Sequence, residues 1–183
     1  MALLHSTMVP LGSAMHDFHL PGTDGKEYSL ASFKESKVLV IIFMCNHCPY
    51  VKAVLQRLID LQNEFRGQAV QLIGINPNDA DRYPDDSPES MRELVQEKNI
   101  PFPYLIDATQ QVAKTYDAVC TPDIYVYGED RKLLYRGRID DNWEKPQAVT
   151  RRDLQEAIMN ILAGEPVSAE QIPSMGCSIK WKE

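Results

Sequence analysis

The chain has 183 residues, which fits one domain with additions and suffices to bury a core without disulfide cross-links. Its 19 Lys and Arg residues against 26 Asp and Glu residues give a formal net charge of −7, which disfavours nucleic acid and anionic membranes as partners. The first twenty residues do not read as a signal peptide, and no apolar run is long enough to span a bilayer. We therefore expect a cytoplasmic protein that binds neither nucleic acid nor membranes.

The first part of the chain predicts a hairpin, a buried strand and a helix, in that order. Residues 17–30 contain two short strand-like stretches around a Pro-Gly turn, a pattern typical of a β-hairpin. Residues 38–44 form an unbroken apolar run, as expected of a strand buried on both faces. From Val51 to Phe65 apolar side chains recur every three or four residues, which predicts a helix that ends at Gly67.

The middle of the chain continues this alternation. The expected order is strand 69–75, helix 88–95, strand 104–106, helix 112–116 and hairpin 124–139. The acidic stretch 79–89 follows a strand end, and we expect a solvated loop there, with substrate selection as the alternative. Arg136 and Arg138 alternate with apolar residues, which predicts that both lie on the exposed face of the hairpin.

The last part of the chain predicts one amphipathic helix followed by an irregular tail. Thr150 and Asp153 form a capping-box pattern before that helix, and Gly164 ends it. Strand–helix alternation with a terminal hairpin and helix indicates an α/β fold with a mixed central sheet flanked by helices. We expect a single domain over 1–183, divided into an N-terminal extension with the hairpin (about 1–34), a core (about 35–164) and a C-terminal tail (about 165–183).

The sequence Cys45-Asn46-His47-Cys48 lies where the buried strand turns into the first helix. This position places Cys45 at the helix N-terminus, where free amide groups and the helix dipole stabilise a thiolate. Cys48 follows one turn later, within reach of a disulfide. We expect Cys45 to attack a substrate disulfide and Cys48 to resolve the mixed disulfide, while His47 tunes the thiolate.

The segment Met44–Lys52 resembles the active-site segment of the peroxiredoxin-like branch of the thioredoxin superfamily. Its members are described as redoxin or alkyl-hydroperoxide-reductase/thiol-specific-antioxidant proteins. The similarity continues through Tyr83–Glu89, Cys120–Asp123, Tyr135–Arg138 and Gly176–Lys182. The resemblance implies a thioredoxin-like fold and a redox role.

The resemblance also implies roles outside the C-x-x-C motif. Pro122 matches the cis-proline that faces the dithiol in thioredoxin-like proteins, and the backbone of Thr121 before it would pair with a substrate. The implied partners are protein or small-molecule disulfides and an unidentified thiol that donates or accepts electrons. Thiol–disulfide exchange needs no bound cofactor, and none is expected.

Three positions depart from the patterns of the relatives. The hydroxyl residue that assists peroxide chemistry in peroxiredoxins corresponds to Ile42, which argues against a peroxidase. The buried acid of thioredoxin corresponds to Leu39, so that proton relay is missing. The tryptophan that usually precedes the first cysteine is replaced by Met44.

Three functions remain open from the sequence. The leading one is a dithiol–disulfide oxidoreductase that uses Cys45 and Cys48; the second is a thiol peroxidase that uses Cys45. The third is a non-enzymatic zinc or copper protein that uses Cys45, Cys48, His47 and also Cys120. Cys120 is in addition a possible third redox cysteine, with a buried structural thiol as the plainer interpretation. Cys177 is expected to be a free thiol in a docked tail, with a further redox partner as the alternative.

Overall fold

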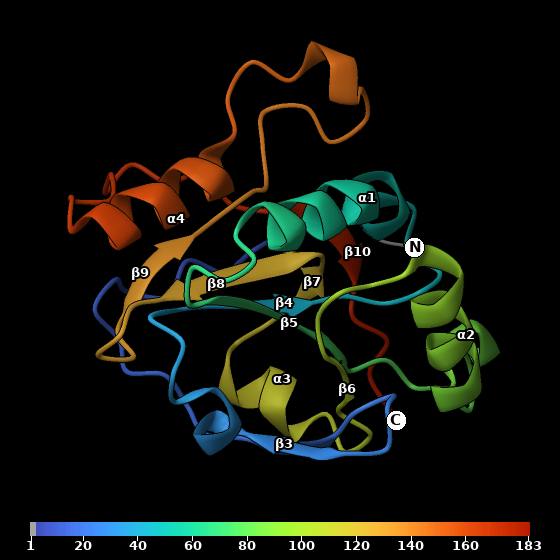
Figure 1. Ribbon diagram of the computed structural model, residues 1–183. Helices are drawn as coiled ribbons and strands as arrows, with labels where there is room; N and C mark the ends of the chain where they lie inside the picture. Colours follow the sequence, from blue (N-terminus) through green and yellow to red (C-terminus); the bar gives the residue numbers. More distant parts are fainter. Residues whose placement is uncertain (1–2) are drawn as a thin grey trace.

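A computed structural model describes residues 3–183 of the chain (Figure 1). The strands are β1 (Leu3–His5), β2 (His19–Pro21), β3 (Glu27–Ser29), β4 (Val38–Phe43), β5 (Val70–Asn76), β6 (Tyr104–Ile106), β7 (Cys120–Thr121), β8 (Asp123–Tyr127), β9 (Leu133–Arg136) and β10 (Met175–Ser178). The helices are α1 (Pro49–Glu64), α2 (Pro88–Lys98), α3 (Gln111–Thr115) and α4 (Asp153–Ala163). Among the described residues, no helix combines the length and apolar character needed to cross a membrane.

The central sheet is mixed and has the strand order β6-β5-β4-β8-β9. Strands β4, β5 and β6 are parallel, whereas β8 and β9 are antiparallel to their neighbours. Helices α1 and α4 lie over one face of the sheet, α3 and the β2–β3 hairpin lie over the other, and α2 lies at the β6 side (Figure 1). The predicted α/β fold with a mixed central sheet and an N-terminal hairpin is therefore confirmed.

Strand β4 is the centre of the core because both of its faces are buried. Every second residue from Val38 packs with apolar side chains of α1 and α4. The alternate residues from Leu39 pack with side chains of α3 and of the N-terminal region. Each large aliphatic side chain buried in this way stabilises the fold by about 1.5–3 kcal/mol. This two-sided burial fixes the carboxyl end of β4 and hence the start of the loop that carries the C-x-x-C motif.

The C-terminal tail contains regular structure that the sequence pattern does not show. Met175–Ser178 form β10, which lies between β1 and β7 in a second, three-stranded sheet. The expectation of an irregular tail was wrong for these residues. The sequence pattern fails here because β10 pairs with strands more than fifty residues away in the chain, so that no local pattern predicts it.

Two expectations about the second half of the chain were also wrong. Arg136 does not face solvent: it is fully buried, with its Nη2 atom 3.1 Å from Asp123 Oδ2 and its guanidinium 4.2 Å from the ring centroid of Tyr125. A carboxylate and an aromatic face together allow the cation to be buried. Thr150 does not cap α4, because its hydroxyl donates to Asp141 and the N-cap position is Arg152.

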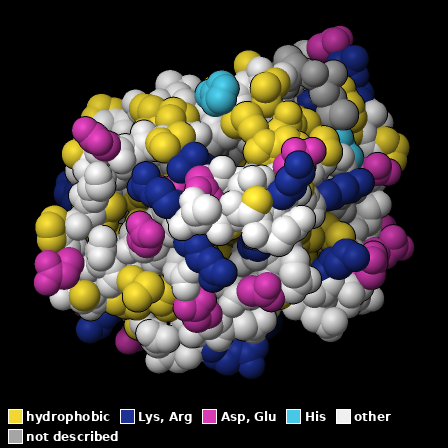
Figure 2. All heavy atoms as spheres, turned by 90° about the horizontal axis from the view of Figure 1, so that it is seen from above, with side chains coloured by type: hydrophobic (Ala, Val, Ile, Leu, Met, Phe, Trp, Pro, Cys, Tyr) yellow, Lys and Arg dark blue, Asp and Glu magenta, His cyan; other side chains and the backbone are white. Residues whose placement is uncertain are grey.

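The surface over α1 and α4 carries both signs of charge. Figure 2 shows Lys and Arg side chains interspersed with Asp and Glu side chains on this face, with hydrophobic side chains between them. The overall net charge of −7 is therefore not concentrated on this side of the molecule. Interspersed charges give weak long-range fields, so this face is unlike the single-sign surfaces that bind polyanions.

Candidate functional site

Pro49 determines where helix α1 begins. Proline lacks an N–H and suits the first helical position, and it keeps the preceding residue out of the helical region. Accordingly, Cys48 has extended backbone angles (φ −67°, ψ 123°) and is the N-cap residue of α1. The prediction that Cys45 occupies the helix N-terminus was wrong, because Cys45 lies three residues earlier. The helix end acts directly on Cys48.

Thr121 contacts both cysteines of the motif. Its hydroxyl Oγ1 lies 3.4 Å from Cys45 Sγ, and its carbonyl oxygen accepts a hydrogen bond from Cys48 Sγ at 3.0 Å. The Thr121–Pro122 peptide bond is cis, as the resemblance to thioredoxin-like proteins implies. Both cysteines are almost fully buried, with 1% and 0% of their surface exposed. The fold thus brings together the two predicted parts of the site, the dithiol and the Thr121–Pro122 segment.

The two cysteine thiols titrate as a pair. A hydrogen bond from Cys45, opposed by burial and helped by the Val51 amide, lowers the pKa of Cys48 to about 4. The same hydrogen bond, together with burial and the charge of Asp86, raises the pKa of Cys45 well above its ordinary value. The Thr121 carbonyl has the opposite effect and favours the protonated form of Cys48, because a carbonyl oxygen can accept a hydrogen bond only from a protonated thiol. The reduced pair therefore holds one thiolate and one proton between the two sulfurs.

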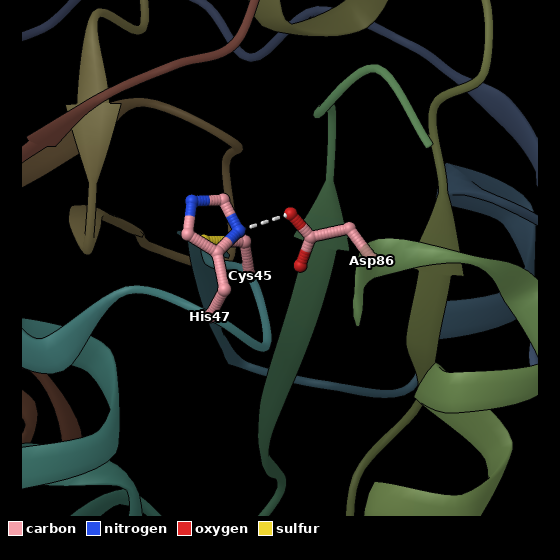
Figure 3. A group of neighbouring side chains, drawn as sticks. All are labelled: Cys45, His47 and Asp86. Carbon is pink, nitrogen blue, oxygen red and sulfur yellow. Dashed lines mark hydrogen bonds and ion pairs between the residues drawn. The ribbon is translucent and has the colours of Figure 1, made fainter. Parts of the chain in front are cut away.

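His47 lies against a buried carboxylate, as Figure 3 shows. Its Nδ1 atom is 2.6 Å from Asp86 Oδ2, and its ring stacks on Tyr83 at a centroid distance of 5.3 Å. Among the described residues, no hydrogen-bond partner is found for His47 Nε2, which is buried. A carboxylate on one ring nitrogen orients the imidazole and leaves the other nitrogen free to exchange a proton.

Asp86 is held by more than the histidine. It accepts hydrogen bonds from the backbone N–H of Asn46 at 2.7 Å and from the Asn78 side chain at 2.8 Å. Burial raises the pKa of Asp86, but the hydrogen bonds from His47, Asn78 and Asn46 outweigh it, so that the pKa is lowered overall. Asp86 therefore favours its negatively charged form beside the dithiol loop.

Asp86 is a candidate site residue that sequence reasoning missed. It belongs to the acidic stretch 79–89, which we expected to be solvated, yet only 2% of its surface is exposed. The signal was present in the resemblance, since Tyr83–Glu89 is one of the shared strings. With several acidic side chains in one short stretch, the sequence alone did not indicate which of them turns inward.

Two cavities lie near the site, and Cys45 lines one of them. One, of about 490 Å³, lies between the motif, α1 and α2 and is lined by Cys45, Asn46 and Lys52 among others. The other, of about 310 Å³, is lined by Pro122, by Met175 of β10 and by the aromatic pair Tyr50 and Trp143. Cys48 lines neither cavity, so Cys45 is the sulfur of the motif that borders the first one.

The remaining cysteines lie on different sides of β7. Cys120 Sγ donates to the Pro122 carbonyl oxygen at 3.7 Å, and burial and the charge of Asp123 raise the pKa of Cys120. Cys177, on β10, is paired in register with Thr121. All four cysteines are free thiols. A redox role for Cys120 stays a prediction.

Cys45, His47 and Asp86 could hold a metal ion. Each offers one ligand atom, and these atoms lie within 4.8 Å of one another. This set differs from the one predicted for a metal site, since Asp86 takes the place of Cys48 and Cys120. Sulfur, imidazole and carboxylate ligands together suit zinc.

Known proteins resemble this chain over most of its length. The sequence model of the family described as AhpC/TSA matches residues 11–136. An uncharacterized conserved protein from Geobacillus kaustophilus is 45% identical, with a TM-score of 0.94 over 100% of this chain and 97% of that one. The thiol-disulfide oxidoreductase ResA of Bacillus thuringiensis is 20% identical over 124 residues, 68% of this chain and 67% of ResA.

A more distant structure shows the fold. The thioredoxin domain of a thiol-disulfide oxidoreductase from Bacteroides vulgatus is 17% identical, with a TM-score of 0.60 over 70% of this chain and 89% of that one. The chain therefore has a thioredoxin-like fold.

Proposed function

Because this chain belongs to the AhpC/TSA family, we propose that it is a dithiol–disulfide oxidoreductase in which Cys45 attacks and Cys48 resolves. The observation that carries the proposal is the contact of both sulfurs with one residue, Thr121. Its hydroxyl can donate to a Cys45 thiolate while its carbonyl accepts from a Cys48 thiol. This arrangement supports the state in which the shared proton has moved to Cys48 and Cys45 carries the charge.

The first chemical step begins from that state. The Cys45 thiolate attacks one sulfur of a substrate disulfide that enters through the cavity beside α2, and the other substrate sulfur leaves as a thiolate. His47, hydrogen-bonded to Asp86 through Nδ1, is the proposed proton donor to this leaving group. Cys48 then attacks Cys45, which releases the reduced substrate and forms the Cys45–Cys48 disulfide.

The partners we propose are disulfides of proteins or small molecules, with a separate thiol that returns the protein to its starting state. The burial of both sulfurs favours substrates that can extend a disulfide into the cavity over those that present it on a flat surface.

The experiment that tests the proposal is a redox titration in glutathione buffers, followed by alkylation and mass mapping of all four cysteines. We expect a reversible Cys45–Cys48 bridge. In Cys48→Ser, a mixed disulfide should accumulate on Cys45; in the matched variant Cys45→Ser, it should not. Cysteines 45 and 48 that stay unpaired over the whole range of potentials contradict the proposal.

A thiol peroxidase is the second candidate, and one contact favours it. The sequence lacks the peroxiredoxin hydroxyl at Ile42, yet Thr121 Oγ1 supplies a hydroxyl 3.4 Å from Cys45 Sγ. Addition of hydrogen peroxide separates the two functions. A peroxidase would convert Cys45 to sulfenic acid and, with an added thiol that reduces the sulfenic acid back to the thiol, consume peroxide catalytically even in Cys48→Ser.

A metal site is the third candidate, supported by the grouping of Cys45, His47 and Asp86. Stoichiometric zinc or copper in protein purified under reducing conditions would support it. Loss of that metal in Asp86→Asn would identify the ligand set.

A further inference from the structure

Strand β10 brings a third cysteine to the dithiol. Cys177 lies directly opposite Thr121 in an antiparallel pair, and Ser178 lies opposite Cys120. Residues directly opposite each other in such a pair have their side chains on the same face of the sheet. Since the Thr121 hydroxyl faces Cys45, the Cys177 side chain lies on the dithiol side of β7. By the same alternation, Cys120 lies on the other side.

Contacts of the Cys177 thiol agree with this placement. It packs in the same buried cluster as Cys45 and Cys48, and only 3% of its surface is exposed. Burial and a side-chain hydrogen bond with Cys48 raise the pKa of Cys177 to about 11, while the same bond helps to lower the pKa of Cys48. Cys48 therefore interacts with two other cysteines, Cys45 and Cys177.

Gly176 fixes how closely β10 approaches the site. A Cβ atom at this position would lie 2.0 Å from the Thr121 carbonyl oxygen and 3.0 Å from the Pro122 nitrogen. Only glycine lets the strand lie so near that backbone. The neighbouring Cys177 is thereby held beside the residue that contacts both sulfurs of the motif.

We propose that Cys177 is a third redox thiol that accepts the disulfide from Cys45 through Cys48. This inference rests on the proposed function, which supplies the Cys45–Cys48 disulfide. The Cys177 thiolate attacks Cys48 Sγ, the Cys45–Cys48 bond breaks and a Cys48–Cys177 bond forms. Cys45 leaves as a thiolate and takes up the proton that Cys177 has lost. One disulfide is present before and after, so no outside oxidant or reductant is required.

The exchange would free the reactive thiol while the protein stays oxidised. Cys45 returns to a thiol beside His47 and Asp86, at the cavity where the substrate enters. The oxidising equivalents move to a bond between two sulfurs that do not line that cavity. The protein could thus begin a second attack before its disulfide is reduced.

Mapping of disulfides in a variant without Cys45 tests the relay. In Cys45→Ser, oxidation in glutathione buffer should produce an intramolecular Cys48–Cys177 bridge, found by alkylation and mass mapping. The matched variant Cys45→Ser/Cys120→Ser should keep that bridge, and Cys45→Ser/Cys177→Ser should lose it. A Cys48 that is only glutathionylated, in a folded Cys45→Ser variant with native circular dichroism, would overturn the proposal.

Oxidised wild type gives the second measurement. A fraction of its molecules should show Cys45 free to alkylation with Cys48 and Cys177 bridged, and Cys177→Ser should abolish that fraction. If Cys45 and Cys48 bridge normally and this fraction is absent, the relay fails while the proposed oxidoreductase stands. If no Cys45–Cys48 bridge forms, the proposed function fails, and the Cys45→Ser result still decides whether Cys177 reaches Cys48.

Discussion

Asp86 and Asp123 are two buried carboxylates beside cysteines, and they differ in their partners. Asp86, near Cys45, is bonded to His47, which can gain and lose a proton. Asp123, on β8 directly after Pro122, is bonded to Arg136, whose charge is fixed. Asn46, whose backbone N–H donates to Asp86, lines a cavity, whereas Asp123 and Arg136 are fully buried. In the function proposed above, the first group takes part in proton transfer, whereas the second only stabilises the fold.

The pKa values of the two carboxyl groups are shifted in opposite directions. Burial raises the pKa of Asp123, against the pull of Arg136 and the Ser6 hydroxyl. Hydrogen bonds to Asp86 outweigh its burial and lower its pKa. The fold thus favours the charge on Asp86 and tolerates the charge on Asp123 only because a cation is enclosed with it. We expect substitution at Asp123 to act on stability and substitution at Asp86 to act on chemistry.

The largest effect should come from Asp123→Asn. It leaves the Arg136 cation buried without a counter-charge, and breaking a buried pair in this way costs about 3–5 kcal/mol. Denaturant unfolding followed by circular dichroism measures the loss. Asp81→Asn, at an exposed position, is the matched control and should change the free energy of unfolding little. A loss no larger than that of the control would show that Arg136 finds another partner.

The next effect should be a loss of exchange rate in Asp86→Asn. The amide keeps the shape of the side chain but removes the negative charge that lies against the His47 ring. We expect thiol–disulfide exchange to slow about 10²-fold, the lower end for loss of acid–base assistance. Release of thiol from a small disulfide, followed by stopped flow across a range of pH, measures the rate.

Two controls keep this second prediction specific. Asp81→Asn should leave the rate and its pH profile unchanged, and unfolding experiments should show that Asp86→Asn remains folded at the assay temperature. If the rate equals that of the wild type at every pH, Asp86 has no role in the chemistry. It would then have only a structural role, like Asp123.

The core of the molecule could be predicted because its signals are local. The unbroken apolar run of β4 predicts a strand buried on both faces, and the adjacent C-x-x-C motif predicts a dithiol at the end of that strand. Pro122 was identified from its resemblance to a known position, and its peptide bond is cis. In each case neighbouring residues carry the whole pattern.

The surroundings of the dithiol could not be predicted because they depend on contacts between distant residues. Asp86 turns inward to meet Asn46, His47 and Asn78, the first two about forty positions away. Arg136 is buried because Asp123 and Tyr125 lie on the neighbouring strand. Cys177 reaches the site because β10 pairs with β7, more than fifty residues earlier. Composition and local periodicity do not predict such contacts between residues that are distant in the sequence.

The smallest expected effect is a change in the pKa of Cys48 when Cys45 is replaced. In Cys45→Ala, the hydrogen bond that contributes most to lowering the pKa of Cys48 is gone, so this pKa should rise from about 4 toward the ordinary range of a thiol. Wild type should show thiolate absorbance that disappears only as the pH falls through about 4. In the variant this loss should begin at a higher pH. The amide of Val51 and the thiol of Cys177 remain, so the rise should be incomplete. An unshifted titration would assign the low pKa to the helix N-terminus, and the two cysteines of the motif would then titrate independently.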